Sequence, residues 1–347
     1  MFDLSKIDKN LEVGKDINKS DVKFYNIDEF PFKIYGVFKE NGLYRRMPED
    51  VAKAVSSGVY ELHTNTAGGR VRFITDSRYI AIHADMDKLC RIPHSTFTGT
   101  AGFDLYADNS YIKAFIPPLE MTDGYESIVE FETKELREIT INFPSYSNVK
   151  DLYIGLQENN ILKEPSPYRI TKPILYYGSS ITQGACASRP GMIYQNIISR
   201  QFDCDYINLG FSGNARAEDI MIEYIKNLDM SVFVCDYDHN SPSAEHLDIT
   251  LKKMFNEVRS EHPDIPVIFM SRPKYTLTDD EVKRMNVVEG TYKSALASGD
   301  KNVYFLGGKA LMKLCKNDGV VDGGHPSDLG FASMAIAIAD ILQLVLL

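Results

Sequence analysis

The stretch KPILYYGSSITQG, residues 172–184, decides how this chain folds. Its apolar run ends at Gly178 and is followed at once by Ser179 and Ser180. An apolar run without polar alternation is typical of a parallel strand that helices cover on both faces. Two small hydroxyl residues at the end of such a strand suggest a serine nucleophile. A nucleophilic serine needs a histidine base, an acid and hydrogen-bond donors, which later segments must supply.

Later segments show further apolar strands that alternate with amphipathic helices. Further strands are expected over residues 206–210, 231–237, 267–272 and 303–308. Between residues 243 and 262, Leu247, Leu251 and Val258 follow helical spacing, and Ser243 can cap this helix. Two more helices are expected, over residues 217–228 and from Ser327 onward. This alternation predicts right-handed βαβ units on a parallel sheet, and therefore an α/β fold.

The first half of the chain has a different pattern of expected secondary structure. Short strands are expected over residues 32–38, 58–66, 70–77 and 137–144. In the last of these, Ile139, Ile141 and Phe143 alternate with polar residues, as in a half-buried strand. The pattern predicts a β-sandwich. The polar, proline-containing segment 157–173 is the best linker, so we expect domains at residues 1–160 and 161–347.

The amino-acid composition limits which binding partners and which cellular compartment we expect. The formal net charge of −10 argues against nucleic acid or an anionic membrane as the main partner. No secretory h-region is present at the N-terminus, and no uninterrupted apolar run reaches the ~18 residues of a spanning helix. The five cysteines are widely spaced and form no CxxC pair, which favours reduced thiols in the cytoplasm. Whether the chain forms a homo-oligomer is left open.

Four polar clusters contain residue types that can act in catalysis. They are residues 178–180, 210–214, 236–240 and 321–330. The first three follow apolar strands, so in a parallel sheet they lie at one edge, where ligands bind. Asp322 and His325 are separated by two glycines, and a tight turn could place the carboxylate on the imidazole. The backbone N–H groups of Ser180 and Gly213 and the amide of Asn240 could stabilise an oxyanion.

Each of these pieces also has a purely structural interpretation as a turn, a helix cap or a loop glycine. The aspartates and histidines near residues 236–239 and 322–325 could in principle bind a metal. However, the sequence has no HExxH, His-x-His or CxxC motif, so we expect no metal and no cofactor. Neither the G-x-G-x-x-G nor the phosphate-loop pattern occurs in YYGSSITQG.

The order of the four blocks resembles that of the SGNH, or GDSL-type, hydrolases. The blocks are YGSSITQG, NLGFSGNA, DYDHNSP and DGGHPSDLG. The resemblance implies that Ser180 is the nucleophile, that Asp322 and His325 complete the triad, and that Gly213 and Asn240 are oxyanion donors. The chain departs from the usual pattern at two places. Ser179 stands where an aspartate is common, and DHN replaces GxND, so that Asn240 is followed by Ser241 and not by an acid.

The block GFDLY, residues 102–106, resembles the Gly-x-Asp-Leu-Tyr motif of β-sandwich domains that precede some SGNH domains. This resemblance implies a jelly-roll-like sandwich before a three-layer α/β/α domain. It also implies a carbohydrate acetylesterase that removes small acyl groups, chiefly acetyl, from a sugar or oligosaccharide. Asp104 and Tyr106 could then contact substrate, as could His239. Arg45 and Arg46 are expected on a solvated face.

Two alternatives remain beside the carbohydrate esterase. The first is another acylhydrolase on the same site, such as a lipase or thioesterase. The second is a carbohydrate-binding protein without catalysis.

Overall fold

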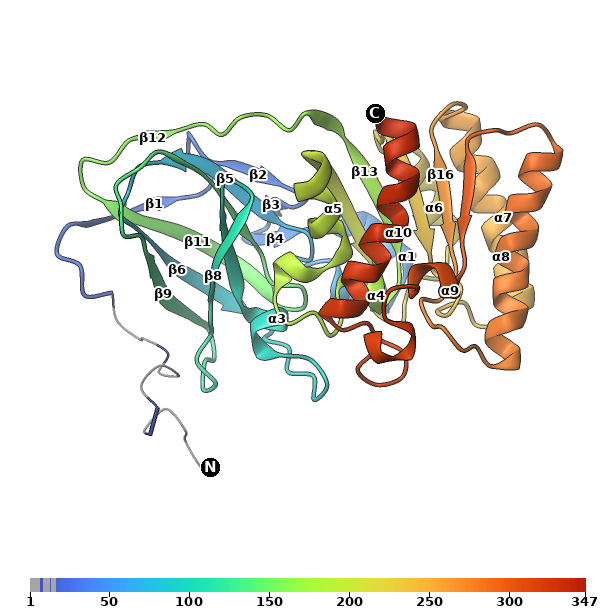
Figure 1. The fold of residues 1–347 in the computed structure, drawn as a ribbon, viewed down its shortest axis with the longest axis horizontal. Helices are drawn as coiled ribbons and strands as arrows, with labels where there is room; N and C mark the ends of the chain where they lie inside the picture. The colour runs from blue at the N-terminus through green and yellow to red at the C-terminus, as the bar shows by residue number, and fades with distance from the viewer. Residues whose placement is uncertain (1–6, 9–12, 14–16) are drawn as a thin grey trace.

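Two antiparallel sheets form the first half of the molecule (Figure 1). The computed structural model describes residues 7–8, 13 and 17–347. One sheet has the order β1–β11–β6–β9, and its strands are Val22–Asn26, Asn148–Gln157, Tyr79–Asp87 and Gly124–Glu130. The other has the order β12–β5–β10–β7–β8, and its strands are Leu162–Lys163, Arg70–Thr75, Arg137–Asn142, Phe103–Ala107 and Ser110–Phe115. The short strand β2, Lys33–Tyr35, also pairs with β5, and β3 (Phe38–Glu40) pairs with β4 (Leu43–Arg45).

The two antiparallel sheets share one apolar core. Ile80 and Ile82 of β6 contribute to the same buried cluster as Ile139 and Ile141 of β10. The alternation along residues 137–144 is therefore confirmed as the inward face of a sandwich strand.

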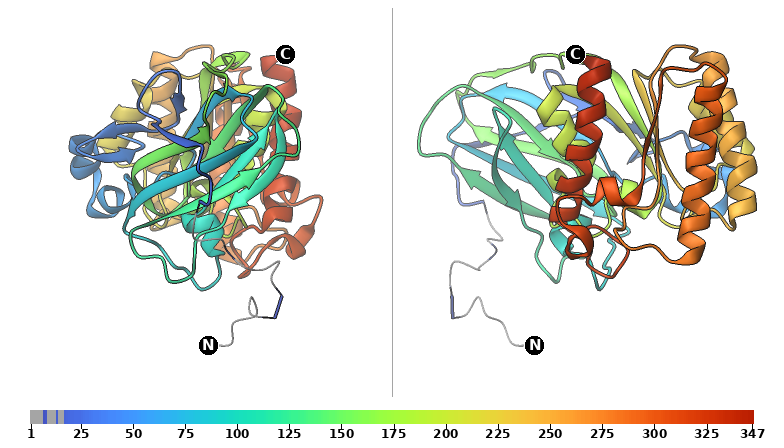
Figure 2. Two further views of the ribbon diagram at one scale, coloured as in Figure 1. Left: turned by 90° about the vertical axis from the view of Figure 1, so that its left-hand side faces the viewer. Right: turned by 45° about the vertical axis from the view of Figure 1, so that its right-hand side comes forward.

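The second half contains a five-stranded sheet that is parallel throughout, with the order β14–β13–β15–β16–β17. Its strands, in chain order from β13 to β17, are Ile170–Gly178, Cys204–Gly210, Val232–Asp236, Val267–Met270 and Val303–Leu306. Ile174 and Tyr176 of β13 belong to one buried cluster, while Leu175 and Tyr177 belong to another on the opposite face. Helices cover both faces, which gives three layers (Figure 2) and confirms the predicted α/β fold.

The helices divide between the two faces. Helices α5 (Tyr194–Phe202), α9 (Gly308–Leu311) and α10 (Asp328–Leu346) pack on one face, and α6 (Asp219–Lys226), α7 (Ala244–Glu261) and α8 (Asp279–Ala297) pack on the other. Ser243 caps α7 by accepting from the His246 N–H, as predicted. By length and composition α10 could cross a membrane, but Phe331, Met334 and Ile338 are buried in the core of this half.

Two expectations about the first half are wrong. Residues 58–66 do not form a strand. Instead, Ser56 accepts a hydrogen bond from the Val59 N–H and begins helix α2, Ser57–Leu62. With α1 (Glu49–Val55), α2 packs on the parallel sheet, because Val59 is buried in the cluster that includes Leu175. Early segments thus cover the later sheet, and the division into residues 1–160 and 161–347 stays a prediction.

The expectation that Arg45 and Arg46 lie on a solvated face is also wrong, since each is only 2% exposed. Arg45 forms ion pairs with Glu40 and Glu49. Arg46 donates only to backbone carbonyls, two of which belong to Asn208 and Gly210 at the end of β14. Burial lowers the pKa of Arg46 to about 9.

Candidate active site

The candidate nucleophile begins a helical turn at the end of the central strand. Helix α4, Ser180–Gln183, starts two residues after β13, and the Ser179 side chain caps it by accepting from the Ile181 N–H at 3.1 Å. Gly178 is needed at this point, because a Cβ there would lie 2.3 Å from the carbonyl oxygen of Asp236. The turn therefore sits directly against β15 and presents Ser180, which is 7% exposed.

Ser180, His325 and Asp322 form a continuous hydrogen-bonded chain. The Oγ atom of Ser180 lies 2.8 Å from Nε2 of His325, and Nδ1 of His325 lies 2.7 Å from Oδ2 of Asp322. The other carboxylate oxygen of Asp322 accepts from the backbone N–H groups of His325 and Gly324. This arrangement keeps a proton on Nδ1 and leaves Nε2 able to accept the proton of the serine hydroxyl.

The surroundings of Asp322 keep it ionised. Partial burial acts to raise the pKa of its carboxyl, but the hydrogen bonds from the His325 backbone and ring and from Gly324 outweigh this effect. The pKa of Asp322 is therefore well below its usual value. Gly323 supports the tight turn by adopting a positive φ of 81°. A carboxylate held in this way can stabilise an imidazolium on His325.

The loops that carry Gly213 and Asn240 leave the two strands beside β13. Gly178 pairs with Gly210 of β14 on one side and with Asp236 of β15 on the other, so the three strand ends lie level. Gly213 has a φ of +69°, and a side chain there would meet open space. The Oδ1 atom of Asn240 accepts from the Ala215 N–H at 3.4 Å, which leaves the amide Nδ2 as a donor.

Asp104 and Tyr106, from the GFDLY motif, lie on β7 and bind protein groups. Asp104 accepts from Arg189 at 2.7 Å and from the Gly191 N–H at 2.8 Å, and Arg189 also donates to the Tyr106 hydroxyl. Asp104 is fully buried. These contacts tie the sandwich to the loop that follows the candidate nucleophile. A contact of either side chain with substrate stays a prediction.

His239 also has both ring nitrogens engaged by the protein. Nδ1 lies 2.8 Å from Asp238 Oδ1, and Nε2 lies 2.6 Å from Ser179 Oγ. The predicted substrate contact of His239 likewise remains a prediction. His239 thus contacts Ser179, the cap residue of the turn that presents Ser180.

Several residues that position this site were not found from the sequence. Gln183 donates to Asn65 Oδ1 and accepts from the Ser212 N–H, so it connects helix α4 with the loop of Gly213. His94 stacks on His325 with ring centroids 5.5 Å apart. Because these contacts join segments far apart in sequence, no local spacing could have revealed them.

Among the described residues, two groups bring potential metal ligands within 4.8 Å of one another. They are His94 with Cys186 and His325, and Asp236 with Asp238 and His239. His325 and His239 already hydrogen-bond to a serine and an aspartate each.

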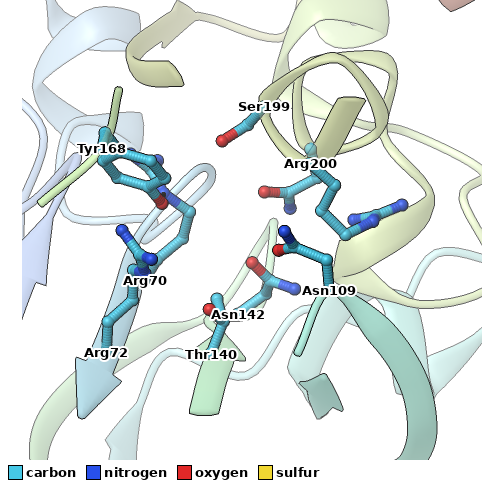
Figure 3. Close-up of a pocket in the computed structure, with 9 residues that line it drawn as sticks. Arg70, Arg72, Asn109, Thr140, Asn142, Tyr168, Ser199 and Arg200 are labelled. Atoms are coloured by element: carbon cyan, nitrogen blue, oxygen red, sulfur yellow. Dashed lines mark hydrogen bonds between the residues drawn. The ribbon is translucent and has the colours of Figure 1, made fainter. Parts of the chain in front are cut away.

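A small cavity lies at the junction of the two halves, apart from the triad (Figure 3). Its volume is about 10 Å³, which is room for roughly one water molecule. Arg70 and Arg72 reach it from β5, Thr140 and Asn142 from β10, and Arg200 from α5. The cavity is therefore part of the interface between sandwich and α/β half.

Comparison with known proteins places both halves in families. Residues 171–343 match the model of the GDSL-like lipase/acylhydrolase family. Residues 22–162 match the GxDLY model, which describes the N-terminus of SGNH-hydrolase-type esterases. Comparison with curated protein sequences gives no match.

Solved structures resemble nearly the whole chain. A GDSL-like lipase from Bacteroides ovatus is 26% identical, with a TM-score of 0.83 over 94% of this chain and 98% of that one. The salicylyl-acyltransferase SsfX3 from a tetracycline biosynthetic pathway is 17% identical, with a TM-score of 0.75 over 94% and 98%. A family two carbohydrate esterase from Cellvibrio japonicus is 11% identical, with a TM-score of 0.65 over 93% and 98%.

The last two likenesses concern the fold alone, whereas the family models carry the assignment. Both models match in the order expected from the GFDLY block and the four later blocks. The chain therefore belongs to the GDSL-like lipase/acylhydrolase family, with a GxDLY domain at its N-terminal side, and is a carboxylic ester hydrolase.

Proposed function

We propose that this protein is a serine esterase that removes small acyl groups, chiefly O-acetyl, from a sugar or oligosaccharide. The observation that carries the proposal is the chain from Ser180 Oγ through His325 to Asp322, with contacts of 2.8 and 2.7 Å. A serine hydroxyl becomes an effective nucleophile only when a base lies within hydrogen-bonding distance.

In the proposed mechanism, the hydroxyl oxygen of Ser180 attacks the ester carbonyl while Nε2 of His325 takes the proton. Asp322 stabilises the imidazolium that forms. The negative charge of the tetrahedral intermediate is stabilised by the N–H groups of Ser180 and Gly213 and by the Asn240 amide. His325 then gives its proton to the departing sugar oxygen. Water, activated by the same histidine, releases the acyl group from Ser180.

The fold and the family both support a carbohydrate substrate. The fold resembles family two carbohydrate esterases, one of which is from Clostridium thermocellum and is known in complex with cellohexaose. That enzyme is 17% identical to this chain, so the likeness concerns the fold. The GxDLY domain joined to the acylhydrolase region is consistent with the same class of enzyme.

Mass spectrometry of acetylated xylo- and manno-oligosaccharides after incubation with the protein tests the substrate. We expect successive losses of one acetyl mass, and none with Ser180→Ala. Ser260→Ala, which changes an exposed serine far from the site, is the matched control and should behave like the natural chain. Intact oligosaccharides together with hydrolysis of simple acetyl esters would reject the carbohydrate assignment and leave the esterase.

A panel of p-nitrophenyl esters separates the alternative acylhydrolases. Acetyl esters should be hydrolysed fastest, and the rate should fall as the acyl chain lengthens. A preference for long chains would favour a lipase or thioesterase. No turnover of any ester, with oligosaccharide binding intact, would favour the non-catalytic carbohydrate-binding protein.

A further inference from the structure

A second Ser–His–Asp chain lies directly beside the first. Ser179 Oγ is 2.6 Å from Nε2 of His239, and Nδ1 of His239 is 2.8 Å from Oδ1 of Asp238. Ser179 is fully buried, Asp238 is 2% exposed, and the side chain of His239 is 7% exposed. The proposed reaction does not use any of these three side chains.

Burial and hydrogen bonding exclude Ser179 as a second nucleophile. Its Oγ atom caps helix α4 by accepting from the Ile181 N–H, and none of its surface is open to an ester. A neutral His239 satisfies every contact in the chain, because Nδ1–H donates to Asp238 while Nε2 accepts from the Ser179 hydroxyl. The second chain is therefore a structural connection rather than a second catalytic triad.

The far end of this connection is firmly anchored. Oδ2 of Asp238 accepts from the backbone N–H of Arg272, just after β16. Arg284 of α8 donates to the carbonyl oxygens of Asp238 and Ser241 on the same loop. The loop that carries Asn240 is thus held by two neighbouring elements, and His239 transmits that anchoring to Ser179.

Ser179 and His239 each directly precede a residue of the candidate site. Ser179 precedes Ser180, whose N–H is a proposed oxyanion donor, and His239 precedes Asn240, whose amide is another. The chain also departs from the general motif on both sides of this contact, at Ser179 and in the DHN segment that contains Asp238 and His239. Because His239 hydrogen-bonds to Ser179, the two departures belong to one structural connection.

We propose that His239 is a positioning residue that fixes the geometry of the oxyanion hole. Through Ser179 it sets the position of the Ser180 turn relative to the Asn240 loop. The inference rests on the proposed function of Ser180 and Asn240. Oxyanion donors accelerate a reaction only when they are aimed before the charge develops, and a misplacement of about 1 Å can cost about 100-fold in rate.

The test is a double-mutant cycle of Ser179→Ala and His239→Ala, measured with p-nitrophenyl acetate. We expect each variant to lower kcat by about 10- to 100-fold with KM little changed, since the contact acts on the transition state. The double variant should lose little more than Ser179→Ala alone, because His239 acts through its hydrogen bond to Ser179. His83→Ala, which changes a half-exposed histidine of the sandwich, is the control.

Two conservative variants make the test specific. His239→Gln can still reach Ser179, whereas His239→Asn can reach only Asp238. We expect Gln to recover much of kcat and Asn to recover little. Circular dichroism and thermal unfolding identify the folded variants, and His239→Gln and Ser179→Ala keep the test decisive where His239→Ala does not fold.

Normal kcat in the folded variants, or independent additive losses, would overturn the inference. A raised KM with normal kcat would place His239 on the substrate and would also overturn it. Ser180→Ala in the same assay keeps the two proposals apart. If that variant retains activity, the proposed function fails. If it is inactive while the folded His239 variants are unimpaired, the positioning role alone fails.

Discussion

Asp322 and Asp236 are both carboxyls near Ser180, but their surroundings shift their pKa values in opposite directions. Asp322 accepts three hydrogen bonds from His325 and Gly324, and its pKa is well below the usual value despite partial burial. Asp236 is fully buried, and burial raises its pKa to about 6, although a hydrogen bond from Thr182 lowers it. Asp322 is therefore held ionised for the proposed triad, whereas ionisation of Asp236 in the folded state costs free energy.

Replacing Asp322 by Asn tests the role of the Asp322 charge and of the His325 tautomer together. The amide can still accept the backbone hydrogen bonds, but its NH₂ group would face Nδ1 of His325 and favour the tautomer that cannot accept from Ser180. We expect kcat for p-nitrophenyl acetate to fall by roughly 10³- to 10⁴-fold. Asp340→Asn, in the exposed part of α10, should have normal activity. A loss smaller than tenfold in Asp322→Asn would contradict this role.

Replacing Asp236 by Asn should change the pH dependence of stability. Because the pKa of Asp236 is about 6 in the folded state and about 3.9 when unfolded, the folded state binds this proton more tightly. Asp236 therefore lowers the free energy of unfolding progressively as pH rises from about 4 to about 6. Urea unfolding at several pH values should show that this decline is absent in Asp236→Asn. The same decline in variant and natural chain would show that another group causes it.

At the scale of elements, helix α4 connects the separate parts of the candidate site. Its residue Gln183 is fully buried and bonds Asn65, the Ser145 carbonyl and the Ser212 N–H. A helix of only four residues cannot hold its own position. It is held instead by these tertiary contacts and by the Ser179 cap.

Gln183→Ala should therefore weaken both stability and activity. The substitution removes the hydrogen bonds of Gln183 to the Ser212 N–H, to the Oδ1 atom of buried Asn65 and to the Ser145 carbonyl, which should lower the free energy of unfolding by about 2 kcal/mol or more. It also frees the loop that carries Gly213, so kcat should fall. Urea unfolding and ester hydrolysis measure the two effects. Gln201→Ala, at an exposed position, is the control, and an equal effect in both variants would refute the account.

The elements also show which parts of the fold can be read from the sequence. The helix over residues 243–262 was predictable because its apolar spacing and its serine cap agree. The segment 58–66 was not, because its short apolar pattern fits a strand as well as a helix. What decides it is the burial of Val59 against the parallel sheet, a contact made by distant residues.

At the scale of the molecule, buried polar contacts join the two halves. Arg189 pairs with Asp104 of the sandwich, and Arg70 of the sandwich pairs with Asp205 of β14. The halves also meet around the small cavity of Figure 3. The order of the candidate site residues could be predicted, because parallel strands end at one edge. The contribution of the sandwich could not, because it depends on pairing across the interface.

Asp104→Ala tests how far the sandwich supports the site. Removing this carboxylate leaves Arg189 without its ion-pair partner and the Gly191 N–H without an acceptor, so stability should fall by about 3–5 kcal/mol. Asp264→Ala, at an exposed position, should change stability little. Thermal and urea unfolding compare the two variants. Equal stability of both would mean that the Asp104 contacts contribute nothing to the junction.

The most direct test of the central claim is the site of labelling by a fluorophosphonate probe, located by tandem mass spectrometry. A serine activated by His325 should react, so we expect one adduct on the natural chain, carried by Ser180. The adduct should be lost in Ser180→Ala, strongly slowed in His325→Ala, and unchanged in Ser260→Ala. An adduct on another residue, or labelling that persists in Ser180→Ala, would contradict the account.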